Sequence, residues 1–143
     1  IDEFIEKGEV EYVILLTHTF KSILHEFGMD ISPVLQKIGN HIGEYIFSQL
    51  KDDDLDIFTK NISMYWLKNN LGELSFNIGN NIEITCTDCF ESKESAIIGK
   101  PNCYLEKGML EKLFNMYFHF DLNIEEIMCY SMGDEKCVYQ LQP

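Results

Sequence analysis

Apolar residues in the first half of the chain recur every three to four positions, which is the spacing of amphipathic helices. This pattern predicts a helix over residues 17–27, with Gly28 as its stop. A second helix is predicted to begin at Ser32, because Ser caps helices and Pro33 suits the first helical position, and to run to about Leu50. Within it, Gly39 and Gly43 lie on one face, where another backbone can approach closely.

Two short apolar stretches precede these helices. Ile1, Phe4 and Ile5 form an amphipathic arm that ends near Gly8 and is too short to be stable alone, so we expect it to dock on its own domain or on a partner. The run at residues 12–16 fits either a short strand or the first turns of a helix, and periodicity leaves both open.

A third helix is predicted after the acidic run Asp52, Asp53 and Asp54, which suits the positive end of a helix dipole better than a metal site. Two apolar stripes follow along it. They are Leu55, Phe58, Ile62 and Tyr65 on one side, and Ile57, Met64, Leu67 and Leu71 on the other. A helix that is apolar on two sides is expected to lie buried between layers.

The second half of the chain changes to short β-like runs. Residues 73–78 and 82–87 flank a Gly-Asn-Asn turn and predict a hairpin, and residues 124–130 and 136–142 predict another. A helix over residues 109–119 separates the two hairpins. We therefore predict a single α+β domain over residues 1–143, with N-terminal helices packed on an antiparallel sheet made of two hairpins with one helix between them.

Composition narrows the class of protein. The chain is 45% hydrophobic and 24% charged, which is typical of a folded globular domain. Its net charge of -13 repels phosphate backbones, so we expect no direct nucleic-acid binding. No apolar run is long enough for a membrane span and none resembles a cleavable signal, so we expect a cytoplasmic protein. Because the chain begins at Ile1 rather than Met, we also expect a preceding segment.

All five cysteines lie in the last two fifths of the chain, and an odd number favours reduced thiols over a disulfide framework. Cys103, Cys129 and Cys137, together with Glu126, supply the four ligands of a closed tetrahedral zinc site. Pairing of the second hairpin around Gly133 would make Cys129 and Cys137 cross-strand neighbours. Glu126 lies an odd number of residues before Cys129, so an ion shared by both requires a bulge or an irregular strand. A chance cluster of buried cysteines is the alternative.

Cys86 and Cys89 form a rival Cys-x-x-Cys arrangement. On a regular strand their odd separation would place the two thiols on opposite faces, which disfavours a shared ion. We therefore expect both to be small hydrophobic residues that lie in the core or line a pocket.

The spacing Pro101-x-Cys103-x4-Gly108, followed by Glu126-x2-Cys129-x3-Gly133-x3-Cys137, resembles the signature of the 4-vinyl reductase domain family. That family includes bacterial sensors of aromatic compounds and is related to vesicle-transport particle subunits. The resemblance implies a structural zinc held by the four residues named above. The sensors' phenol pocket uses a Trp just ahead of the metal loop, and the corresponding residues 84–89 here contain none, so the resemblance implies a pocket but not phenol as its ligand.

No catalytic motif occurs, and the histidines His18, His25, His41 and His119 follow no catalytic spacing, so we expect no enzyme. The leading hypothesis is a regulatory sensor for a small hydrophobic ligand, and aromatic side chains are the typical wall of such a pocket. The residues predicted to line it are Trp66, Phe114, Tyr117, Phe118 and Cys86. The alternatives are an assembly module acting through homodimer contacts and an accessory protein of tetrapyrrole reduction.

Overall fold

A computed structural model describes residues 15–16, 18–93 and 97–143 of the chain, which forms two compact units, Ile1–Ile31 and Ser32–Pro143. In the first unit, residues 15–16 and 18–26 are helical and Gly28 has a left-handed φ of 73°, as predicted for a helix stop. The predicted arm at residues 1–8 and the start of the 12–16 run lie outside the described residues. The prediction of one domain over residues 1–143 stays a prediction.

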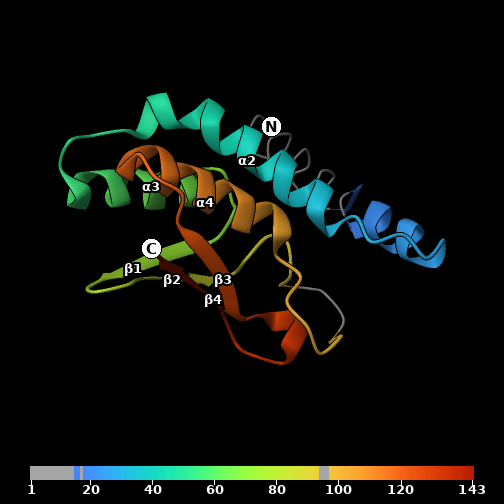
Figure 1. The fold of residues 1–143 in the computed structure, drawn as a ribbon. Coiled ribbons are helices and arrows are strands. Elements are labelled where there is room, and N and C mark those ends of the chain that lie inside the picture. The colour runs from blue at the N-terminus through green and yellow to red at the C-terminus, as the bar shows by residue number, and fades with distance from the viewer. Residues whose placement is uncertain (1–14, 17, 94–96) are drawn as a thin grey trace, which may run out of the picture. The chain divides into compact units, whose positions relative to one another are not determined.

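The second unit confirms the predicted fold class. Its sheet is antiparallel throughout and has the strand order β1-β2-β4-β3, so the two hairpins join through their inner strands β2 and β4 (Figure 1). The elements are α2 (Ser32–Leu50), α3 (Leu55–Lys68), β1 (Glu73–Ile78), β2 (Ile82–Thr87), α4 (Tyr104–Phe118), β3 (Asn123–Met128), the 3-10 turn η1 (Tyr130–Met132) and β4 (Cys137–Gln142).

Helices α3 and α4 cover one face of the sheet, and α2 runs across α4 on the side away from the sheet (Figure 1). The α2 and α4 backbones touch at the predicted glycine face. A Cβ added to Gly43 would lie 2.7 Å from the Met109 carbonyl oxygen, and one added to Gly39 would lie 3.0 Å from Gly108 Cα. None of the helices among the described residues has the length and apolarity needed to cross a membrane.

The prediction that α3 is buried on two sides is wrong. Phe58, Ile62 and Trp66 are fully buried, but the second stripe is not: Met64 is 63% exposed and Leu67 59% exposed. The reason is that α3 packs through one stripe, on the sheet and on α4, while the other described elements leave its outer face uncovered.

Helix α4 begins at Tyr104, five residues before the predicted start at residue 109. Its N-cap residue Cys103 makes no side-chain cap hydrogen bond. Instead the Glu91 carboxylate accepts hydrogen bonds from the backbone N–H groups of Leu105 (2.9 Å) and Glu106 (3.0 Å). A side chain from a distant loop therefore caps the helix, and no local sequence signal marks its start.

Candidate metal centre

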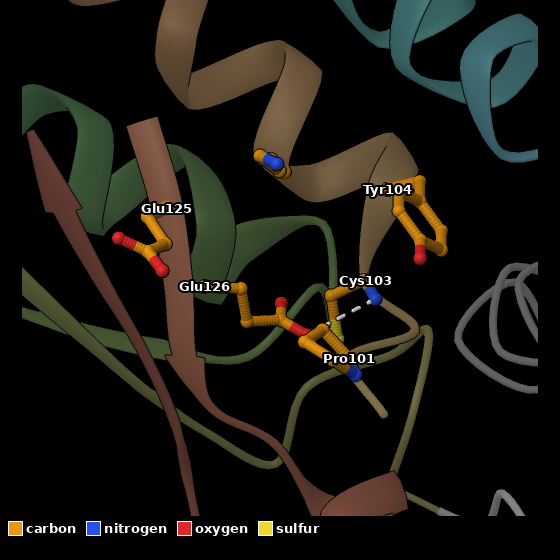
Figure 2. A pocket seen from close by; sticks show the side chains of 6 residues that line it. Pro101, Cys103, Tyr104, Glu125 and Glu126 are labelled. Carbon is orange, nitrogen blue, oxygen red and sulfur yellow. Dashed lines mark hydrogen bonds between the residues drawn. The ribbon is translucent and has the colours of Figure 1, made fainter. Parts of the chain in front are cut away.

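The structure brings the four predicted metal ligands together in the core. Cys103 precedes α4, Glu126 lies in β3, Cys129 follows β3, and Cys137 begins β4. One ligand atom from each lies within 4.8 Å of the others, and all four residues are buried. Figure 2 shows the Glu126 side chain reaching from β3 to Cys103 at the start of α4.

The sulfur spacing fits a tetrahedral ion. Cys103 Sγ lies 3.7 Å from Cys129 Sγ and 3.5 Å from Cys137 Sγ, and the remaining Cys129–Cys137 Sγ pair is 3.8 Å apart. Zinc with sulfur bonds of about 2.3 Å at tetrahedral angles needs sulfur atoms roughly 3.8 Å apart. The three thiols therefore need almost no rearrangement to bind one ion.

The two oxygens of Glu126 have different surroundings. Oε1 accepts hydrogen bonds from the backbone N–H groups of Asn102 (3.1 Å) and Cys103 (3.3 Å). Oε2 is buried and has no hydrogen-bond partner among the described residues. A buried carboxylate oxygen without a partner is costly, and an ion held with the three thiols would satisfy it. The residues present therefore fit a zinc ion.

The backbone supplies the irregularity that the spacing requires. The register of β3 against β4 shifts between Glu126 and Met128, which confirms the predicted bulge. Cys129 then has an extended backbone, and η1 turns the chain back at Gly133, whose φ is 93°. The strand thus ends two residues before the predicted position, but Cys129 still faces Cys137.

Polar groups surround the thiols. Ser92 Oγ lies 2.9 Å from Cys103 Sγ and 3.1 Å from Cys137 Sγ, and Ser131 Oγ lies 3.0 Å from Cys129 Sγ. Such hydroxyls can donate to thiolate sulfur, which is how outer residues hold and tune metal ligands.

Burial strongly affects the protonation of these groups. It raises the pKa of the Cys103 thiol, and it raises the pKa of Glu126 to about 8, with the nearby Cys129 sulfur adding to the effect. Without an ion the cluster therefore favours its neutral, protonated form. Binding of a cation would replace these protons, so metal affinity should rise with pH.

A small cavity of about 170 Å³ adjoins the centre. Figure 2 shows the side chains that line it, which come from the loop before α4, from α4 itself and from β3. They are Pro101, Cys103, Tyr104, Lys107, Glu125 and Glu126. The cavity therefore contacts two of the four candidate ligands.

The five residues predicted to line a ligand pocket fall into two groups. Phe114, Tyr117 and Phe118 belong to one aromatic cluster of α4, in which Tyr117 also stacks on Phe58 of α3 with ring centroids 4.5 Å apart. Trp66 and Cys86 instead contact the carboxylate of Glu106. The assignment of a ligand pocket to these five residues stays a prediction.

Glu106 is the main residue that the sequence analysis missed. It is fully buried, and burial raises its pKa to about 7. Trp66 Nε1 and the Tyr139 hydroxyl donate to its carboxylate over 3.1 and 2.6 Å. The available signal was its position three residues after Cys103, which places an acidic residue on the inner face of a helix that begins at Tyr104.

Cys86 and Cys89 are buried core residues, as predicted, but the argument that they face opposite ways is wrong. Strand β2 ends at Thr87, and Asp88 takes a left-handed φ of 56° that turns the chain back. Both thiols therefore approach Glu106.

Comparison with known proteins places this geometry among related folds. Residues 82–143 match the model of the vinyl-4-reductase domain family. An uncharacterised protein of Methanocaldococcus jannaschii is 26% identical over 106 residues, an alignment that spans 73% of this chain and 66%, just under two thirds, of that protein.

Three solved structures share the fold. The phenol-responsive sensory domain of the transcription activator PoxR, solved with phenol, has a TM-score of 0.74 at 14% identity, over 91% of this chain and 73% of that one. A trafficking protein particle complex subunit 3 from Naegleria fowleri, covalently bound to palmitic acid, has a TM-score of 0.71 at 12% identity, over 95% of both chains. A vinyl-4-reductase family protein from Methanocaldococcus jannaschii has a TM-score of 0.61 at 19% identity, over 92% and 79%.

Proposed function

Since residues 82–143 of this chain belong to the 4-vinyl reductase domain family, as the cysteine spacing predicted, we propose that the chain is a regulatory binding domain for a small hydrophobic ligand, stabilised by zinc. The fold likeness to a phenol-responsive sensory domain supports a sensor role. The cysteines are free, and thiols that bind metal must stay reduced, so we assign the domain to the cytoplasm.

The zinc in this proposal is structural. Cys103, Glu126, Cys129 and Cys137 would fill all four tetrahedral positions, which leaves none for an activated water. The ion would tie the start of α4 to the ends of β3 and β4. This supports a non-enzymatic role, in which the metal holds α4 against the sheet.

One observation carries the sensor proposal: α4 links the candidate metal centre to the aromatic cluster. Cys103 precedes the first turn of α4, whereas Phe114 and Phe118 project from its last turns. A ligand inserted among these rings would push the end of α4, while the metal centre would hold its start. Because α2 touches α4 through Gly39 and Gly43, the displacement would pass to α2.

The proposal is tested with phenol and palmitic acid as probes, since the only tryptophan, Trp66, reports on the core through its fluorescence. We expect one probe to raise the melting temperature and to change Trp66 emission in a saturable way. Tyr117→Leu should weaken that response, whereas Phe120→Leu, at a residue that is 50% exposed just after α4, should not. No saturable response to either probe would count against the sensor role.

A second candidate is an assembly module that acts as a homodimer. It is favoured by the outer face of α2, where Val34 (58% exposed), Ile38 (46%) and Tyr45 (76%) form an apolar stripe at helical spacing. If this face forms the dimer contact, Ile38→Glu should give a monomer in light scattering coupled to size exclusion, and Gln49→Glu on the same helix should not. A wild-type chain that is monomeric throughout the micromolar range would exclude this candidate.

A further inference from the structure

A second group of metal-binding side chains lies beside the first. Cys86, Cys89 and Glu106 are fully buried, and one ligand atom from each lies within 4.8 Å of the others. We propose that these three residues form a second metal site, which takes a soft divalent ion of the zinc class.

The distances within this group fit an ion. Cys86 Sγ lies 3.6 Å from Glu106 Oε2, and Cys89 Sγ lies 3.5 Å from Glu106 Oε1. Bonds of about 2.3 Å to sulfur and about 2.0 Å to oxygen at tetrahedral angles place a sulfur and an oxygen roughly 3.5 Å apart. Each thiol thus already lies at a ligand separation from the carboxylate.

The carboxylate is oriented as metal-bound carboxylates are. Trp66 Nε1 donates to Oε2 and the Tyr139 hydroxyl donates to Oε1, so each oxygen accepts one hydrogen bond and also faces one thiol. Outer hydrogen bonds of this kind fix the direction of a ligand.

The charge of the group also favours a cation. The described side chains that contact the Glu106 carboxylate are two hydrogen-bond donors and two thiols, and none of them is basic. A buried carboxylate and two thiolates carry three negative charges, which are costly in the core unless a positive ion neutralises them. A divalent ion bound to all three removes most of this charge.

The second site adjoins the first through its thiols. Cys89 Sγ lies 3.4 Å from Cys103 Sγ, a ligand of the first centre. A tetrahedral ion held by Cys86, Cys89 and Glu106 would therefore have a fourth thiolate beside it. Thiolates suit soft ions such as zinc and copper(I), so both sites would select the same class of metal.

The test counts zinc ions per chain by native mass spectrometry, on the full chain purified without oxygen and loaded with excess zinc. We expect two ions in the wild type and one in Cys86→Ser and in Glu106→Gln. The control Tyr139→Phe keeps all three ligands, so it should still bind two. Cys129→Ser should keep the second ion, and Cys86→Ser combined with Cys129→Ser should bind none.

The outcomes separate the two sites. A wild type that saturates at one ion, lost in Cys129→Ser and kept in Cys86→Ser, overturns the second site and leaves the first intact. Retention of two ions in both Cys86→Ser and Glu106→Gln also overturns it. The wild-type count needs no variant, and Glu106→Gln preserves side-chain size, so the test does not depend on the folding of Cys86→Ser.

Discussion

A Cβ atom added to Gly39 of α2 would lie 3.0 Å from the Cα of Gly108 in α4, so these two helices meet backbone to backbone. A Cβ on Gly108 would in turn collide with the backbone carbonyl of Gln36. Neither clash can be relieved by turning a flexible side chain. The contact explains why the glycines of α2 lie on one face.

Gly39→Ala should therefore destabilise the fold even though Ala favours helix formation. Overpacking costs about 1–3 kcal/mol, and the gain in helix propensity returns up to about 1 kcal/mol. We expect a net loss in the free energy of unfolding, measured by urea denaturation. Ser48→Ala, at an exposed position of the same helix, should change it by less than about 0.5 kcal/mol. A stabilised Gly39→Ala variant would contradict this packing.

The hydroxyl of Ser131 is expected to tune the first metal centre without binding the ion. It lies 3.0 Å from Cys129 Sγ and 2.7 Å from the Lys100 carbonyl oxygen. Loss of such an outer partner typically lowers metal affinity about 10–100-fold. We predict that Ser131→Ala still binds zinc, but releases it to a competing chelator at a lower chelator concentration than wild type. Met132→Ala, at the exposed neighbouring position, should match wild type.

The metal-stripped chain should lose stability as the pH rises. The pKa of Glu126 is about 8 in the fold against an ordinary value of 4.5, so the folded state holds a proton that the unfolded state has released. This contribution is complete below pH 4.5 and is lost as the pH rises to about 8. Glu106, with a pKa of about 7, acts in the same direction.

The measurement is urea denaturation in excess chelator at about pH 5 and about pH 8, for wild type and Glu126→Gln. We expect the variant to lose less stability across this interval than wild type, because a neutral amide cannot ionise. Bound zinc should reverse the trend, since the ion requires the ionised ligands. Equal pH dependence in the two stripped proteins would show that Glu126 is not buried in its neutral form.

Glu91 should contribute to stability through a helix that lies far from it in sequence. Its carboxylate accepts hydrogen bonds from two N–H groups in the first turn of α4. Loss of a helix cap costs about 0.5–2 kcal/mol. We predict a loss of this size for Glu91→Ala and a smaller one for Glu91→Gln, which keeps an acceptor oxygen. Slowed amide exchange at Leu105 and Glu106 should be present in wild type and disappear in Glu91→Ala.

Much of the local structure was predictable because its causes lie within a few residues. Apolar periodicity and the Ser32-Pro33 start define α2, and the Gly-Asn-Asn turn defines the first hairpin, and both have the bounds that the pattern predicts. The spacing of Glu126, Cys129 and Cys137 likewise required the bulge that β3 contains. Propensity, turn chemistry and ligand spacing act locally, so a sequence can be read for them directly.

The remaining features depend on which distant segments come together. Pairing of β2 with β4, which places Cys86 opposite Cys137, follows from joint burial of two hairpins under α3 and α4. The cap on α4 comes from Glu91, and the turn at Asp88 brings Cys89 to Glu106. By itself, then, the sequence determined the helices, the hairpins and the four candidate zinc ligands. Only the tertiary structure placed the other two cysteines beside a buried carboxylate, because contacts between distant segments are decided by packing of the whole core.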